Sequence, residues 1–106
     1  MKRGDLVLVV LSNDYGKPRP ALVIQSDLFD AHPSFTILPL TSDLEHAPQV
    51  RIRIEPTATN GLKLVSEVMV DKIQSLPLKR FGPVIGEMDS ATMSAVVVAL
   101  ALFLGL

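Results

Sequence analysis

Three short stretches of the 106-residue chain hold side chains that can bind or act on an anionic group. The first is the loop Lys17-Pro18-Arg19-Pro20, in which two cations stand on backbone that the prolines stiffen. An arginine fixed in this way can present its planar guanidinium to a phosphate, because its N–H groups match two phosphate oxygens. The same residues also fit an ordinary surface loop with solvated charges, so local pattern alone leaves both interpretations open.

The other two stretches carry hydroxyl and carboxylate groups. Thr41 and Ser42 follow an apolar segment, where their hydroxyls could either donate hydrogen bonds to an anionic oxygen or cap a turn. Ser66, Asp71 and Lys72 lie on a valine-rich segment. The Asp71 carboxylate could act as a base or hold a cationic side chain, or it could simply form a cross-strand ion pair.

Short strands are the elements that must position these groups. Apolar runs and alternation predict strands at residues 6–11, 21–25, 35–40, 50–55 and 64–73. In the fourth strand Arg51, Arg53 and Glu55 alternate with apolar residues, which predicts a half-exposed strand with a charged outer face. Residues 14–20 and 75–83 are expected to be irregular because prolines and glycines interrupt them. Ser90 is expected to cap a helix that runs to Leu106.

The composition limits the kinds of protein that this chain can be. Ten basic residues against 11 acidic ones give a net charge of −1, which excludes a strongly basic protein that coats nucleic acid. No cysteine is present, so a disulfide, a thiolate zinc site and a cysteine nucleophile are excluded. The two histidines, His32 and His46, are too few for a metal site by themselves.

The C-terminal segment Ser90–Leu106 contains no charged residue. Its 17 residues fall short of the roughly 20 that a membrane-spanning helix needs, so a buried or interface helix is expected. Such a helix is apolar all round, and packing on the domain plus a second copy of the chain would cover it. We expect one domain, with no export signal and a cytoplasmic location.

In their order along the chain, these motifs resemble the MazF/PemK/Kid toxin family. The resemblance is carried by the opening residues MKRGDLV, the segment GKPRPALVIQS ending at Ser26, and the segment LPLTS ending at Ser42. Gly61-Leu62 with Ser66, and the ending from Gly86 through the helix 93–106, also match the family pattern. The resemblance covers nearly the whole chain.

The resemblance implies a mostly β fold, an SH3-like small barrel over about residues 1–80 with a C-terminal helix over about 90–106, in a homodimer. It implies the toxin of a type II toxin–antitoxin system, a metal-independent endoribonuclease without a cofactor that cleaves single-stranded RNA at specific sequences. The cognate antitoxin would block it with an acidic tail. The implied catalytic residues are Arg19, Thr41 and Asp71, and the residues expected to bind RNA are Lys17, Ser42, Arg51, Arg53 and Lys72. Two alternatives are a CcdB-like inhibitor of DNA gyrase and a degenerate toxin without catalytic activity.

The expected reaction is attack of an RNA 2′-hydroxyl on the adjacent phosphorus. Arg19 would stabilise the charge on the phosphorane, Thr41 would donate a hydrogen bond, and Asp71 would act as a base or orient Arg19. The sequence also departs from the family pattern. Met69 stands where some members have arginine, and the first loop is shorter than in many members.

Overall fold

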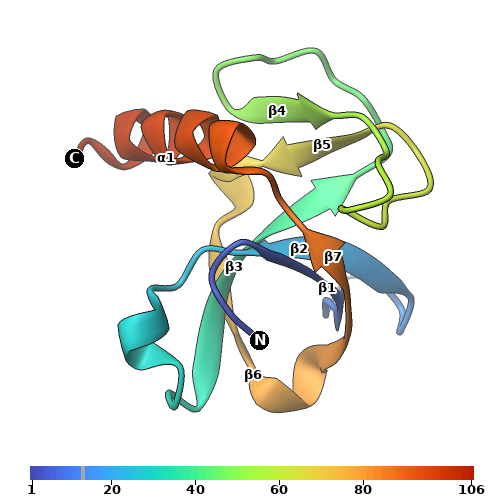
Figure 1. The fold of residues 1–106 in the computed structure, drawn as a ribbon, viewed down its shortest axis with the longest axis vertical. Coiled ribbons are helices and arrows are strands. Elements are labelled where there is room, and N and C mark those ends of the chain that lie inside the picture. The colour runs from blue at the N-terminus through green and yellow to red at the C-terminus, as the bar shows by residue number, and fades with distance from the viewer. Residues whose placement is uncertain (13) are drawn as a thin grey trace.

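The computed structural model describes residues 1–12 and 14–106, and they form a bent antiparallel sheet with one long helix (Figure 1). The strands are β1 (Asp5–Val10), β2 (Pro18–Val23), β3 (Ser34–Thr41), β4 (Arg51–Ile54), β5 (Ser66–Met69), β6 (Gln74–Pro77) and β7 (Phe81–Glu87). The helices are three short 3-10 segments, η1 (Asp27–Phe29), η2 (Val70–Lys72) and η3 (Leu78–Arg80), and the α-helix α1 (Ser90–Leu104). The expected mostly β fold with a C-terminal helix is confirmed.

The sheet is organised around β3. The strands of the sheet lie in the order β4-β5-β3-β2-β1-β7, and β6 also pairs with β3. On one edge β3 pairs with β2, while on the other edge its first half pairs with β6 and its end pairs with β5. η2 separates β5 from β6 in the chain. Because β3 pairs with both of them, it joins the part of the sheet that contains β5 to the part that contains β6.

Strand alternation divides the buried residues between two cores. Leu6, Leu22 and Leu38 face one side of the sheet, where they pack with residues of β5 and with Val96 of α1. Their sequence neighbours, such as Val7 and Ile37, face the other side and form the second core. The sheet is therefore buried on both faces, which accounts for continuous apolar runs in β1 and β3.

β2 begins earlier than the sequence predicts. Residues 14–20 were expected to be loop, but Pro18-Arg19-Pro20 already pairs with β1, with Arg19 opposite Val9. The ladder with β3 starts only at Ala21, so residues 18–20 form an edge segment. Prolines are tolerated at the first residue and the edge of a sheet, because no neighbouring strand needs their missing N–H.

The expectation of irregular backbone at residues 75–83 is wrong. Two strands, β6 and β7, cover most of this stretch, and the sheet extends to Glu87 beyond the expected limit near residue 80. Gly82 and Pro83 lie in β7, which stands at the end of the strand order of the described residues and pairs with β1, with register shifts along that ladder. An edge strand with bulges accommodates both residues.

The N-cap of α1 lies one residue before the position that the sequence predicts. Asp89, not Ser90, is the N-cap, since its carboxylate accepts a hydrogen bond of 2.9 Å from the Thr92 N–H. Gly105 ends the helix in the left-handed conformation with φ 73°. Among the described residues, α1 included, no helix combines the length and apolar character that a bilayer crossing requires.

Gly86 permits the close approach of β7 to the segment before Gly61. A Cβ at Gly86 would lie 2.4 Å from the Thr59 carbonyl oxygen and 2.4 Å from the Asn60 carbonyl carbon. We expect Gly86→Ala to lower the free energy of unfolding by about 2–3 kcal/mol, because rigid backbone must shift to admit the methyl group. Urea denaturation followed by circular dichroism measures this change.

Gly82→Ala on the same strand is the matched control. A Cβ there would meet Leu8 atoms no closer than 3.4 Å, which is ordinary contact. Equal unfolding midpoints for the two variants would contradict the proposed close approach.

Candidate functional site

Arg19 is held by an ion pair that the sequence did not suggest. Its Nε donates to Asp14 Oδ2 at 2.8 Å, and its Nη2 donates to Asp14 Oδ1 at 2.9 Å. The backbone of Asp14 is also fixed in the turn between β1 and β2. Its N–H donates to the Leu11 carbonyl, and its carbonyl accepts from the Lys17 N–H. The guanidinium therefore has a defined orientation at the start of β2.

Sheet register brings Arg19 and Thr41 to the same end of the molecule. The β2–β3 ladder ends at the pair Ala21 and Pro39. Arg19 lies two residues before Ala21, and Thr41 lies two residues after Pro39 in the antiparallel partner. Strand pairing thus places two residues that are 22 positions apart in sequence at one edge of the sheet.

A cavity of about 360 Å³ lies beside this edge. Thr41 and Ser42 line it together with Pro20, the residue after Arg19. Much of the remaining wall is apolar and consists of Leu8, Leu40, Leu62, Leu64 and Ile85. The Thr41 Oγ1 accepts a hydrogen bond of 3.1 Å from the Asp43 N–H. This contact orients the Thr41 side chain while its own hydroxyl proton can still be donated.

Lys63 and Ser66 also line this cavity, and Lys63 was missed by the sequence analysis. The turn that carries Lys63 is fixed by the buried side chain of Asn60, which is 4% exposed. Its Oδ1 accepts from the Thr57 and Leu62 N–H groups, and its Nδ2 donates to the Glu55 carbonyl. The signal was present, because Asn60-Gly61 marks a turn, but it does not reveal which strand ends that turn approaches.

The structure does not bring Asp71 to Arg19 or Thr41. Asp71 accepts from Arg51, whose Nε lies 3.2 Å from Oδ1, and Glu45 adds a second carboxylate 3.7 Å from Arg51 Nη2. In Figure 1 the segment that carries Asp71, between β5 and β6, lies below α1 and away from the turn between β1 and β2. Of the alternatives that the sequence left open for Asp71, the ion pair with a neighbouring strand describes its contacts.

The expectation of a charged outer face on β4 is wrong for Arg51. Only 8% of Arg51 is exposed, because Asp71 and the segment before β4 cover it. Arg53 is exposed and follows the expectation. Lys17, Ser42 and Lys72, which are also predicted to bind RNA, are exposed, although Lys72 lies on η2 with Asp71 and away from the cavity.

Glu67 is a buried carboxylate that ties the segment after β3 to β5. It is 2% exposed and accepts hydrogen bonds from the N–H groups of Glu45 and His46. The Arg53 guanidinium lies 3.5 Å from it, and Arg53 also contacts His46 Nδ1. These contacts, the Glu45 N–H first, lower the pKa of Glu67 below its ordinary value of 4.5, although burial opposes the shift. Glu67 on β5 is the register partner of Thr41 on β3 and of Arg53 on β4. It therefore lies between Thr41, which lines the cavity, and Arg53.

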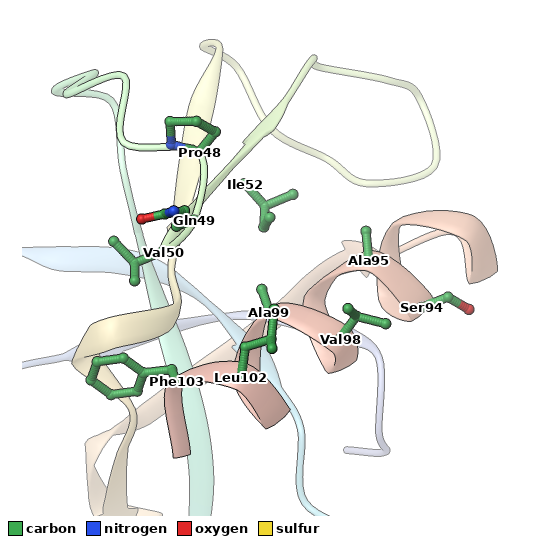
Figure 2. Close-up of a pocket in the computed structure, with 10 residues that line it drawn as sticks. All are labelled: Pro48, Gln49, Val50, Ile52, Ser94, Ala95, Val98, Ala99, Leu102 and Phe103. Atoms are coloured by element: carbon green, nitrogen blue, oxygen red, sulfur yellow. The ribbon is translucent and has the colours of Figure 1, made fainter. Parts of the chain in front are cut away.

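An apolar groove of about 740 Å³ lies on a different face, between α1 and the segment that enters β4 (Figure 2). Its walls include Val98, Leu102 and Phe103 of α1, facing Val50 and Ile52. Leu102 is 79% exposed and Val98 is 62% exposed. Large apolar side chains with this exposure, gathered on one face, are typical of a surface that binds another protein.

Metal binding finds no support in the described part of the chain. No three of its histidine, aspartate and glutamate side chains lie close enough together to hold a metal ion. The polar side chains that line the cavity are instead those of Thr41, Ser42, Ser66 and Lys63, and Arg19 lies at the same edge of the sheet. Hydroxyl, ammonium and guanidinium groups are suited to a phosphate.

Comparison with known proteins assigns this chain to a family. The sequence pattern of PemK-like, MazF-like toxins of type II toxin–antitoxin systems matches residues 2–104. This chain belongs to that family. A full-length relative, described as the probable endoribonuclease MazF of Mycolicibacterium smegmatis, is 42% identical over 107 residues, covering 100% of this chain and 98% of the relative.

Solved structures of MazF-like proteins share the fold. An endoribonuclease in complex with its cognate antitoxin, from a mycobacterial species, is 25% identical, with a TM-score of 0.83 over 100% of this chain and 96% of the other. The Mycobacterium tuberculosis toxin MazF-mt6 is 23% identical, with a TM-score of 0.82 over 96% of this chain and 97% of the other. The expected family and the MazF-type fold are thereby confirmed.

The contacts of Glu67 predict a pH dependence of stability. Because the pKa of Glu67 is lowered by folding, its contribution is present above pH 4.5 and is lost as the pH falls through the lower, folded value. We expect the wild type to be more stable than Glu67→Gln at pH 7, and the difference to shrink as the pH falls below 4.5. Urea unfolding from pH 7 to pH 3 measures it.

Glu55→Gln, the same substitution at an exposed position, is the control. Its free energy of unfolding should change with pH in the same way as that of the wild type. A stability difference for Glu67→Gln that stays constant with pH would contradict the role given to its carboxylate.

Proposed function

We propose that this chain is an endoribonuclease, the toxin of a type II toxin–antitoxin pair, and that it cleaves single-stranded RNA at the cavity beside Thr41 without a metal ion. The observation that supports this best is the fixed guanidinium of Arg19 at the same sheet edge as the Thr41 and Ser42 hydroxyls. The relative described as a probable endoribonuclease, which matches the whole chain, points to the same activity.

In the proposed reaction, the 2′-oxygen of a ribose forms a bond to the adjacent phosphorus, and the bond from phosphorus to the 5′-oxygen breaks. The 2′-hydroxyl proton passes to a base and the leaving 5′-oxygen gains a proton, so the products are a 2′,3′-cyclic phosphate and a 5′-hydroxyl. Arg19 stabilises the extra negative charge on the phosphorane, and Thr41 donates a hydrogen bond to one of its oxygens. A guanidinium stays protonated in water, so its role is electrostatic.

The other residues that are predicted to bind RNA fall into two groups. Lys17 and Ser42 are exposed near Arg19 and Thr41 in sequence, and we propose that they contact the RNA backbone. Lys63 joins them because it lines the cavity. Arg51, Arg53, Asp71 and Lys72 form a separate charged region, where Asp71 holds Arg51 in place. We propose that this region contacts RNA outside the cleavage point.

Arg19→Ala is expected to reduce the cleavage rate of a single-stranded RNA at least about 100-fold, because it removes the charge that stabilises the phosphorane. Thr41→Val keeps the shape of the side chain and removes one hydrogen bond to a charged group, so a loss of about 10- to 100-fold is expected. Asp71→Asn should retain more activity than Arg19→Ala, since Asp71 contacts Arg51. Cleavage sites are mapped on a long RNA, and rates are then measured on an oligonucleotide that carries one such site.

Product ends and metal dependence provide the controls. The new 5′ ends should accept phosphate from polynucleotide kinase without prior phosphatase treatment, and excess EDTA should leave the rate unchanged. Arg19→Ala must retain the circular dichroism spectrum of the wild type. Intact RNA together with broken DNA in expressing cells would sink the nuclease proposal and support a gyrase inhibitor.

We propose an antitoxin partner whose acidic tail binds over Lys17 and Arg19, because carboxylates of such a tail can pair with the cations that RNA phosphates would contact. A relative with the same fold has been solved with its cognate antitoxin. We propose a cytoplasmic location, since messenger RNA is made and used there.

We also propose that the chain forms a homodimer through the apolar groove between α1 and the segment that enters β4. The groove combines exposed large side chains on α1 with Ala95 and Ala99, whose small size allows a second chain to approach closely. Burying this surface in a second copy would remove it from water, which is the main driving force of such an association.

Leu102→Glu is expected to convert a dimer into a monomer, since it places a charge on a side chain that lines the groove. Sedimentation velocity at micromolar concentration should give twice the chain mass of 11.5 kDa for the wild type and the chain mass for the variant. Leu28→Glu, at an 89% exposed position outside the groove, is the matched control and should remain a dimer. A monomeric wild type would contradict the proposal.

A further inference from the structure

Within the described part of the chain, Asp14 is the residue that hydrogen-bonds the Arg19 guanidinium, and the proposed reaction gives Asp14 no role. Its side chain is only 11% exposed, while that of Arg19 is 31% exposed. A half-buried pair with two hydrogen bonds of 2.8 and 2.9 Å is better defined than an ordinary surface ion pair.

The direction of the contact decides which edge of the guanidinium is covered. Asp14 binds the Nε–H and one N–H of Nη2, which is the side edge of the group. A guanidinium has five N–H groups, so this pair leaves the edge formed by Nη1 and Nη2 uncovered by Asp14. That second edge can bind two phosphate oxygens in a bidentate manner.

The backbone makes Asp14 a rigid support. Its N–H and carbonyl are both bonded within the turn that joins β1 to β2, to Leu11 and to Lys17. Arg19 itself lies between Pro18 and Pro20 on the β1-paired edge segment. The carboxylate and the Cα of Arg19 are therefore both fixed, and together they limit the positions that the guanidinium can take.

We propose that Asp14 is a positioning residue for the cleavage reaction: it clamps the Nε/Nη2 edge of the Arg19 guanidinium so that the edge formed by Nη1 and Nη2 faces the scissile phosphate. This inference rests on the proposed endoribonuclease function. Asp14 lowers the net positive charge that approaching RNA meets, so its benefit lies in orientation, which matters more for the transition state than for substrate binding.

The test compares Asp14→Asn and Asp14→Glu with the wild type on the RNA oligonucleotide defined by wild-type cleavage. We expect Asp14→Asn to lower kcat about 10- to 100-fold while KM changes by less than about threefold, because a misplaced guanidinium still attracts phosphate but no longer fits the phosphorane. Asp14→Glu retains the carboxylate and should recover part of kcat. Asp30→Asn, an identical change at an exposed site on another turn, should leave both constants unchanged.

A spectroscopic measurement separates orientation from folding. In ¹⁵N-labelled protein the Arg19 Nε–H signal should exchange slowly with water in the wild type and be lost to fast exchange in Asp14→Asn. The remaining amide signals should stay dispersed, which shows a folded chain.

Three outcomes would overturn the proposal. Wild-type kcat in Asp14→Asn would remove the positioning role, and so would a lower KM with unchanged kcat, which would identify Asp14 as a competitor of the phosphate. A fast-exchanging Arg19 Nε–H in the wild type would show that the clamp does not form. Failure of the wild type to cleave any RNA is a separate result, since it would refute the proposed function while the NMR measurement still reports on the clamp.

Discussion

The double pairing of β3 is the constraint on which the rest of the structure depends. The strand shares one edge with β2 and divides its other edge between β6 and β5. Because backbone hydrogen bonds fix all three neighbours, the end of β3 has one position relative to the start of β2. Thr41 and Arg19 are brought to the same edge by this pairing, while the hydrogen bonds of their side chains within the described residues go to Asp43 and Asp14.

Three arginines of the sheet and its edge are each paired with a carboxylate. Arg19 pairs with Asp14, Arg51 with Asp71, and Arg53 with Glu67. A chain with a net charge of −1 can therefore keep oriented guanidinium groups without a large positive field. This arrangement lowers the affinity for a long polyanion, because fewer unpaired cations are present to neutralise its phosphates. It favours a few contacts with a defined orientation.

The sequence allowed the prediction of features that depend on local pattern or on motif order. Apolar, extended segments located β1 and β3, and alternation located β4. The order of the motifs identified the family and singled out Arg19 and Thr41. Strand β7 escaped because Gly82 and Pro83 are usually breakers, and only its place at the sheet edge explains why they are tolerated. The burial of Arg51 depends on a residue 20 positions away, and the position of Lys63 depends on where its turn meets β3. Such long-range contacts leave no periodic signal in one sequence.

The buried side chain of Asn60 has a consequence for how this cavity can change over generations. Its three hydrogen bonds close the segment from Glu55 to Leu62 on itself, so the number of residues in that segment is fixed by the reach of one amide. An insertion or deletion there would break the bonds and displace Lys63 with them. This wall of the cavity can therefore be varied by replacing side chains, whereas a change in its length would disrupt the turn.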